Sequence, residues 1–552
     1  MRKSLPAFLA LCCLSATAEA VDWIYDADKG GFGNVTFSAS LGASDSDGSW
    51  YYLDGQGERV YIRNSYSESD TFSIGSTDLA SNINLTLDTD LTCAGFNFTS
   101  SASGIVNVIG ASNSIKLTVN GDIINGTTAQ VNSRLQNLNV YVSGDFNPGQ
   151  FWNGIQDASK VYVGGDIDGN GTQPHFSVAL EGSDISNPDM IVGGIMTNSV
   201  WSSFFGSSKD VYYQVGGFSN MGLIRVFNSS NENYITNFVF TNAAGTNYAS
   251  TNNSNLVEVF GNASNDMKIS VNPLNRSRAR IIMNGEGTQT FGYASNGGSG
   301  SEMVFSGGVV VNSGTLRIKF AQTASAYTYN ATYQKDSTDA AATYAVTYWD
   351  SDGQGAAQTS SSHGDLEING GTFASLEGDS EYTFGAFRFT NIIYKGGKIA
   401  LRISSSENVN DSIDLTSYYM REVNTEDESL VYYTKENGGT VKLADGAAAG
   451  TKVTFEFSGD ILGWLLDYED GSFDINGGKG AKIVSWDAEN KTALSASDFA
   501  GNWITQGDDY MPVFTVADDG LYVRYTVVPE PAEVAAILGA LALAAAALHR
   551  RN

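Results

Sequence analysis

The sequence has few cysteines, and their positions exclude one class of exported protein. Cys12 and Cys13 lie close to the N-terminus, which leaves Cys93 as the one thiol after them. A single thiol cannot form an internal disulfide, so the chain is not a disulfide-stapled scaffold. Cys93 stands among strand-forming residues in DLTCAGFNF, and we expect it to be a buried apolar side chain rather than a nucleophile.

Basic residues are also scarce. The chain has 31 Lys and Arg against 60 Asp and Glu, which gives a formal net charge of −29. Proteins that bind nucleic acid hold its phosphates with clustered Lys and Arg, and no basic stripe occurs in the body of this sequence, so nucleic acid is not an expected partner. An acidic surface instead keeps an exported protein in solution and collects divalent cations loosely.

Helical periodicity is missing outside the two ends of the chain, so helices should be few. What the sequence has instead is 61 Gly with 8 Pro, 27 Tyr and 28 Phe, and many Asn, Ser and Thr. This mixture predicts an all-β protein with many short strands and polar turns. Its 552 residues exceed one ordinary domain and supply enough apolar side chains for a large core.

A short strand followed by a glycine turn recurs five times, as KLTVNGDI, NVYVSGDF, KVYVGGDI, DMIVGGI and YYQVGGF. The last glycine of each turn is Gly121, Gly144, Gly165, Gly194 or Gly217, so one turn follows the next at intervals in the twenties. A period of this length with one strand and one turn is typical of a solenoid, in which each unit buries its apolar face against its neighbours. We therefore predict a β-solenoid over residues 21–438.

Two later stretches repeat the theme of strand, turn and strand: FSGGVVVNSGTLRIKF (305–320) and GDLEINGGTFASL (364–376). The segment GVVVNSGTL, residues 308–316, resembles the autotransporter-associated β-strand repeat. The resemblance implies a right-handed parallel β-helix on the exported side of the cell. Autotransporters end in a β-barrel with an aromatic last residue, whereas this chain ends in Arg550-Arg551-Asn552, so self-translocation across the outer membrane is not expected.

Two segments depart from the repeat pattern. Small and polar residues dominate 321–364, which predicts a loop excursion or a long hairpin that leaves the solenoid. Residues 439–527 hold denser strands with Trp464, Trp486 and Trp503 available for a compact core. We expect this part to be a β-rich cap or small sandwich that closes the open edge of the solenoid.

Residues 1–20 have the features of a secretory signal peptide. They combine a positively charged start, an apolar run over residues 5–14 and a small-x-small site at Ala18-Glu19-Ala20. Cleavage after Ala20 by the secretion machinery would make Val21 the new N-terminus.

The C-terminal segment, residues 528–552, contains a second addressing signal. Pro529-Glu530-Pro531 precedes an apolar run over 534–548, and Arg550 and Arg551 follow that run. The prolines favour an extended segment. The apolar run is shorter than a usual membrane helix, which has about 20 residues, and the arginines should stay on the cytoplasmic side. We expect a C-terminal hydrophobic helix that holds the chain transiently in the inner membrane.

The order and spacing of these features resemble the PEP-CTERM sorting signal of Gram-negative bacteria. The resemblance implies recognition by an exosortase-type membrane transpeptidase and cleavage near Pro529, Glu530 and Pro531. The alternative is a plain C-terminal membrane anchor that stays in place. Such an anchor would not explain the two prolines or the shortness of the apolar run.

One polar cluster has the spacing of a metal loop. Residues 166–171 read DIDGNG, the opening of an EF-type calcium loop, with Asp166, Asp168 and Asn170 as the candidate ligands. The twelfth position is Ser177, where such a loop places a bidentate Glu. Two interpretations stay open, a weak calcium site and a plain Asx-turn, and no other cofactor is expected.

These features favour a non-enzymatic, exported structural or adhesive protein of the cell surface or the extracellular matrix. Exposed Asn, Ser, Thr and Tyr suit contact with an extracellular polysaccharide. The alternative is a secreted polysaccharide lyase or glycosidase, in which Asp122, Asp145 and Asp166 face one groove as acid and base. An Asp after a glycine turn usually caps backbone N–H groups, and this favours the structural interpretation.

Overall fold

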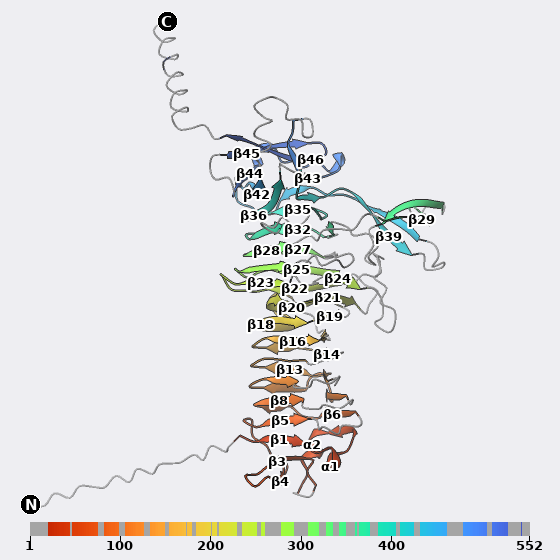
Figure 1. Cartoon of the computed structure of the whole chain (residues 1–552), viewed down its shortest axis with the longest axis vertical. Helices are drawn as coiled ribbons and strands as arrows, with labels where there is room; N and C mark the ends of the chain where they lie inside the picture. Colours follow the sequence, from red (N-terminus) through yellow and green to blue (C-terminus); the bar gives the residue numbers. More distant parts are fainter. Residues whose placement is uncertain are drawn as a thin grey trace, which may run out of the picture.

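The computed structural model describes most of the chain between Ala20 and Val527 (Figure 1). The described residues are 20–44, 47–74, 82–98, 105–125, 133–148, 154–172, 174–178, 184–199, 201–206, 209–228, 234–250, 256–259, 278–291, 307–318, 327–334, 342–348, 359–361, 364–375, 385–404, 409–423, 431–460, 478–504, 510–527 and 543. Several predicted features lie outside them: Ala18 with the rest of residues 1–19, Pro529, Glu530 and Pro531, all of the apolar run but Leu543, and Arg550 and Arg551. Within the described ranges, no helix is long and apolar enough to cross a membrane.

The chain is mostly β, and the prediction of an all-β protein is confirmed. In the described ranges from 20 to 527, helices are limited to α1 (Ala27–Gly30), α2 (Phe37–Leu41) and the 3-10 turns η2 (Ala488–Asn490) and η3 (Ala496–Asp498). The strands form sheets in which parallel pairing dominates. Figure 1 shows these sheets as a tall stack that rises in chain order from the red N-terminal end to the blue C-terminal end.

The largest sheet has 13 strands and follows the chain without reversal. Its order is β7 (Leu91–Cys93), β10 (Lys116–Val119), β13 (Asn139–Val142), β15 (Val161–Val163), β18 (Met190–Ser199), β20 (Val211–Ser219), β22 (Ile235–Phe240), β25 (Arg278–Met283), β27 (Gly308–Val311), β32 (Leu366–Ile368), β35 (Ile392–Tyr394) and β41 (Val441–Leu443), with β16 (Ile167–Thr172) beside β18. Every neighbouring pair is parallel. Successive strands therefore come from successive repeats.

Two further sheets collect the strands that lie between those of the first. One contains β2 (Gly33–Thr36), β6 (Ile83–Leu87), β9 (Val106–Gly110), β12 (Ser133–Gln136), β14 (Gly154–Ala158), β17 (His175–Val178), β19 (Trp201–Gly206), β21 (Leu223–Asn228) and β24 (Leu256–Val259). The other contains β23 (Asn247–Ser250), β26 (Thr288–Phe291), β28 (Thr315–Ile318), β33 (Thr372–Ser375), β36 (Lys398–Ser404), β42 (Val453–Asp460) and β44 (Phe499–Trp503), with β37 (Val409–Asn410) beside β36. Along the chain the strands alternate between sheets, so each sheet grows by one strand per repeat.

The core consists of equivalent side chains stacked in register. The valine before each glycine turn aligns with the valine of the next repeat, and all five are buried: Val119, Val142, Val163, Val192 and Val215. Farther along, aromatic rings fill the interior; the Phe204 ring lies 4.9 Å from that of Phe238 and 5.0 Å from that of Tyr213. The period-2 alternation of the sequence thus defines the buried face of each strand.

Antiparallel strands lie at both ends of the stack. At the N-terminal end, a sheet in the order β11 (Ile123–Asn125), β8 (Gly95–Phe98), β5 (Thr71–Ile74), β1 (Asp22–Tyr25), β3 (Trp50–Leu53) and β4 (Arg59–Tyr61) becomes antiparallel from β1 onward. Trp50 is buried there against Tyr25, Phe37 and Phe72. The open edge of the parallel stack is thereby covered, which limits pairing with other chains.

The C-terminal end is arranged in a similar way. The sheet order is β31 (Thr359–Ser361), β34 (Ala386–Arg388), β38 (Ser412–Asp414), β43 (Ala481–Ser485), β46 (Gly520–Val527) and β45 (Tyr510–Ala517), and its last two pairings are antiparallel. Trp486 and Trp503 are buried as expected, and Trp464 lies outside the described residues. Because β41, β42 and β44 continue sheets that begin upstream, residues 439–527 are built onto the body of the stack.

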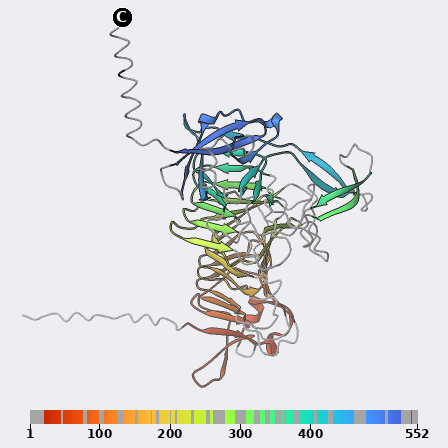
Figure 2. The same cartoon turned by 45° about the horizontal axis from the view of Figure 1, so that its top comes forward.

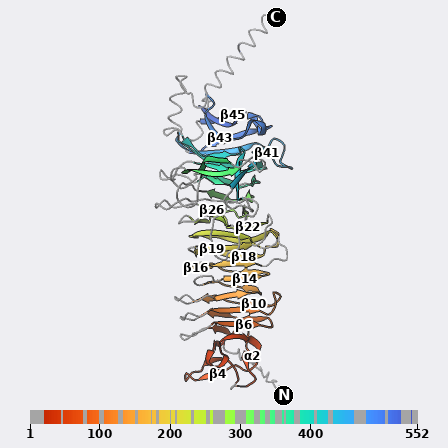
Figure 3. The same ribbon diagram turned by 90° about the vertical axis from the view of Figure 1, so that its right-hand side faces the viewer.

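The segment 321–364, which departs from the repeat pattern of the sequence, contains paired strands. β29 (Tyr327–Gln334) and β30 (Ala342–Tyr348) form an antiparallel hairpin, and β29 also pairs with β40 (Val431–Glu436), which pairs with β39 (Tyr418–Val423). This four-stranded sheet projects from the side of the stack, as two views agree (Figures 1 and 2). Seen from the side, the rest of the stack is narrow (Figure 3).

The predicted burial of Cys93 is confirmed, and it has a measurable consequence. Cys93 is fully buried beside Val119, and burial raises the pKa of its thiol to about 12. In the folded protein the thiol therefore stays neutral at pH 8, where the thiolate is the reactive form.

We predict that Cys93 in the protein that begins at Val21 reacts with a thiol reagent at pH 8 roughly a thousandfold more slowly when folded than when unfolded in urea. The absorbance of the released leaving group measures both rates. Comparable rates in the two states would contradict this placement of Cys93.

Candidate functional site

The three aspartates of the glycine turns lie in one column, but their carboxylates are engaged by the backbone. Asp122 Oδ1 accepts a hydrogen bond from the amide of Asp145 at 2.8 Å. Asp145 Oδ1 accepts one from the amide of Asp166 at 2.7 Å. Asp166 Oδ1 accepts one from the amide of Ile195 at 2.8 Å. Each side chain thus caps the equivalent turn of the following repeat.

This aspartate column explains why the last residue of the pair is glycine at Gly144, Gly165 and Gly194. A Cβ added at Gly144 or Gly165 would lie 2.0 Å from Oδ1 of the preceding repeat's Asp122 or Asp145. The space beside the glycine is filled by the carboxylate, and the two residue types are required together. The turn backbones are also bonded directly, since the Gly165 amide donates to the Gly144 carbonyl at 2.8 Å.

The column ends where the sequence motif changes. Ile195 stands where the earlier repeats have Asp, so no carboxylate caps the next turn. At Gly217 an added Cβ would instead meet the ring of Tyr248, whose Cδ2 lies 2.3 Å away. An aromatic ring therefore occupies the space that a carboxylate fills in the earlier repeats.

The calcium-like loop has the geometry of an Asx-turn. Asp168 Oδ1 accepts hydrogen bonds from the Asn170 amide at 2.8 Å and from Asn198 Nδ2 at 3.2 Å. Asn170 has φ of 46°, a conformation that Asn tolerates in such turns. Asp166 accepts its hydrogen bond from the Ile195 amide. The described ranges contain no group of three His, Cys, Asp or Glu side chains placed to hold a metal ion. The calcium site stays a prediction.

Amide ladders between repeats were missed from the sequence. Asn84 Nδ2 donates to Asn34 Oδ1 at 2.9 Å, and Asn107 Nδ2 donates to Asn84 Oδ1 at 2.7 Å. A second ladder joins Asn284, Asn312 and Asn369. The signal that could have revealed them is Asn at one strand or turn position of successive repeats.

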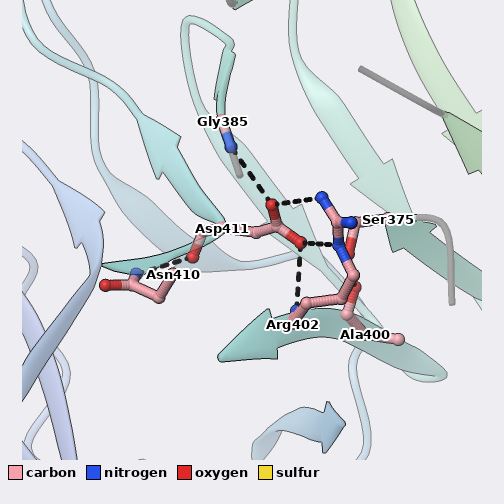
Figure 4. A network of polar contacts seen from close by, with 6 residues as sticks. All are labelled: Ser375, Gly385, Ala400, Arg402, Asn410 and Asp411. Atoms are coloured by element: carbon pink, nitrogen blue, oxygen red, sulfur yellow. Dashed lines mark hydrogen bonds and ion pairs between the residues drawn. The ribbon is translucent and has the colours of Figure 1, made fainter. Parts of the chain in front are cut away.

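A buried ion pair near the C-terminal end was also missed (Figure 4). Asp411 is fully buried, and Arg402 binds it through Nε at 2.7 Å and Nη2 at 3.0 Å. The Gly385 amide donates to the same carboxylate at 3.2 Å, as does the Arg402 amide at 3.1 Å. Both carboxylate oxygens are thus bonded, and the pair joins neighbouring segments of the chain.

The outward face of the 13-stranded sheet carries a column of exposed and partly exposed side chains. The strand register aligns one outward residue from each of six successive strands: Thr92, Thr118, Tyr141, Tyr162, Ile191 and Gln214. Tyr162 is 42% exposed, and the other five are partly exposed. Two tyrosine rings in adjacent strands beside hydroxyl and amide groups form a surface suited to a sugar chain.

At the expected N-terminal processing site, the described part begins with Ala20. Ala20 is exposed, whereas Val21 packs against the core. The expected cleavage point therefore lies between an exposed residue, Ala20, and a residue that packs against the core, Val21.

No known protein family matches this chain, and a search of curated proteins found no significant relative.

The coupling between glycine and aspartate can be tested at Gly165. We predict that Gly165→Ala destabilises the fold by about 1–3 kcal/mol, because the new methyl group overlaps the Asp145 carboxylate and the Gly144 backbone. Gly55→Ala is the matched control, since an added Cβ there meets no atom within 4 Å. Urea unfolding followed by tryptophan fluorescence measures both. Equal midpoints for the two variants would show that the space beside Gly165 is not filled.

Proposed function

We propose that this chain is an exported, non-enzymatic structural or adhesive protein of the cell surface or extracellular polysaccharide matrix, with a right-handed parallel β-helix as its body. The observation that carries the proposal is the growth of three sheets in chain order, with side chains of one repeat bonded to the next. In a solenoid of this kind each repeat contacts only its neighbours, and the result is a long, stiff body.

The capping of the turns supports a structural role for the aspartates. A lyase or glycosidase needs carboxylates directed at a substrate, one as acid and one as base. Here one oxygen of each of Asp122, Asp145 and Asp166 holds a backbone amide of the following repeat. These were the residues on which the enzyme alternative depended, and no other observation favours it.

Adhesion is assigned to the outward column that includes Tyr141 and Tyr162. Stacked parallel strands place equivalent side chains about 4.8 Å apart. A sugar chain laid along the column can stack on the tyrosine rings and bond to Thr118 and Gln214. The formal net charge of −29 favours a neutral polysaccharide over a polyanionic one as the partner.

Delivery rests on the two ends of the sequence. The signal peptide would direct export and be removed after Ala20, and the C-terminal segment would hold the chain in the inner membrane. An exosortase-type transpeptidase would then cleave near Pro529-Glu530-Pro531 and release the body to the envelope surface or the matrix. The order of the motif, the short apolar run and the terminal arginines support this route.

The sorting step is tested by replacing Pro529-Glu530-Pro531 with three alanines in the native cells. We predict that the wild-type protein loses its tail and reaches the surface or matrix, whereas the variant keeps the tail and stays in the inner membrane. Intact mass and cell fractionation measure the two effects. Glu533→Ala, in the same segment but outside the motif, is the control and should be processed normally. Retention of the tail in both proteins would identify a plain anchor.

The adhesive surface is tested by the double variant Tyr141→Ser and Tyr162→Ser. We expect binding to the cells' own extracellular polysaccharide to weaken roughly tenfold or more, because the exposed ring of Tyr162 and the partly exposed ring of Tyr141 are lost from the contact. Phe32→Ser is the control, since Phe32 is 43% exposed but lies outside the column. Co-sedimentation with the polysaccharide gives the affinities. Unchanged binding by the double variant would remove this column from the proposal.

A further inference from the structure

Asp70 is a buried carboxylate at the N-terminal end of the stack. It is 3% exposed, and its oxygens accept three hydrogen bonds from neutral donors. The Val21 amide donates to Oδ1 at 3.0 Å, and the Trp23 indole Nε1 and the Ser67 amide donate to Oδ2, each at 2.8 Å. The carboxylate is therefore well bonded, and none of these three donors carries a charge.

No cation compensates this charge in the part of the chain that the structure describes. The ion pairs between described side chains involve other acidic residues, the nearest in sequence being Asp26 with Arg59. A buried carboxylate without a cation costs free energy even when it is hydrogen-bonded. A positive charge placed at one of its donors would offset that cost.

Val21 is the residue that can supply the charge. It follows the expected cleavage site directly, and it is fixed in place because its carbonyl accepts a hydrogen bond from the Thr71 amide at 2.8 Å. Asp22 then begins the parallel pairing of β1 with β5. The atom that would become the new α-amine is thus the nitrogen already 3.0 Å from Asp70 Oδ1.

We propose that removal of the leader converts the Val21 amide into an ammonium group that pairs with Asp70 and locks β1 onto β5 in the mature protein. Hydrolysis breaks the Ala20–Val21 C–N bond; water supplies the carboxylate oxygen of Ala20, and the Val21 nitrogen becomes a protonated amine. The inference rests on the proposed processing after Ala20. A protein cut elsewhere lacks the lock, since each extra residue displaces the amine by up to about 3.5 Å.

Four proteins test the lock, each extending to Asn552 and purified in detergent. Two begin at Val21, and two retain Glu19-Ala20 before it; each form is made with Asp70 and with Asp70→Asn. Hydrogen exchange of the peptides covering β1 and β5 is measured by mass spectrometry. We expect the Val21 start to slow exchange about tenfold relative to the extended chain when Asp70 is present, and to have no effect with Asp70→Asn.

Equal exchange in the two Asp70 chains, or a difference that persists with Asp70→Asn, would overturn the lock. If Asp70→Asn does not fold, labelling of the α-amine in the two Asp70 chains decides the question. The paired amine of Val21 should label about tenfold more slowly than the free amine of Glu19, and equal rates would overturn the proposal.

N-terminal sequencing of the exported protein distinguishes failure of the proposed processing after Ala20 from failure of the lock between Val21 and Asp70. A first residue other than Val21 overturns both the processing after Ala20 and the lock. A Val21 start without an exchange difference overturns the lock alone and leaves the proposed export route standing.

Discussion

The structure depends on side chains of one repeat that satisfy backbone amides of the next. At the turns, Asp145 holds the Asp166 amide, and the glycine beside it leaves the space for that carboxylate. The same device recurs at other positions: Asp90 accepts from the Lys116 amide, Asp189 from the Tyr212 amide and Asp210 from the Ile235 amide. Because turn amides at a stack of parallel strands would otherwise lack partners, these contacts fix the register in which repeats add.

The two ends of the stack cover the surfaces that the terminal repeats would otherwise expose. A repeat in the middle has neighbours on both sides, whereas a terminal repeat exposes unpaired backbone groups and an apolar face. Antiparallel strands and dense aromatic packing close both ends. Trp50 packs at one end, and at the other Phe514 of the antiparallel β45 packs against Phe457 of β42, which also contacts Trp503 of β44. Terminal units with a composition unlike that of the interior are what a stacked architecture requires.

The sequence predicted the repeated parts of the fold well and the contacts between repeats poorly. Valine alternation and glycine turns are local patterns, so the strands around Val142 and Val163 and their buried faces could be foreseen. The bond from Asp122 to the Asp145 amide joins two distant positions of the chain, and only the register reveals it. The Arg402–Asp411 pair and the pairing of β29 with β40 depend in the same way on how separate segments come together. The spacing of Asp166, Asp168 and Asn170 left a weak calcium site and an Asx-turn both open, because the two begin with the same residue types. The contact of Asp168 with the Asn170 amide shows the turn, and calcium binding stays a prediction.

The coupling of a glycine to the aspartate one repeat earlier also governs how such a protein can change in length. Loss or gain of a single residue would place a side chain against the carboxylate, whereas removal of a whole unit leaves the column continuous. The chain can therefore be shortened or extended in whole units, each adding about 4.8 Å to the height of the stack. The four steps from Gly121 to Gly217 account for only about 19 Å of that height, so the stack gains height slowly and in fixed increments.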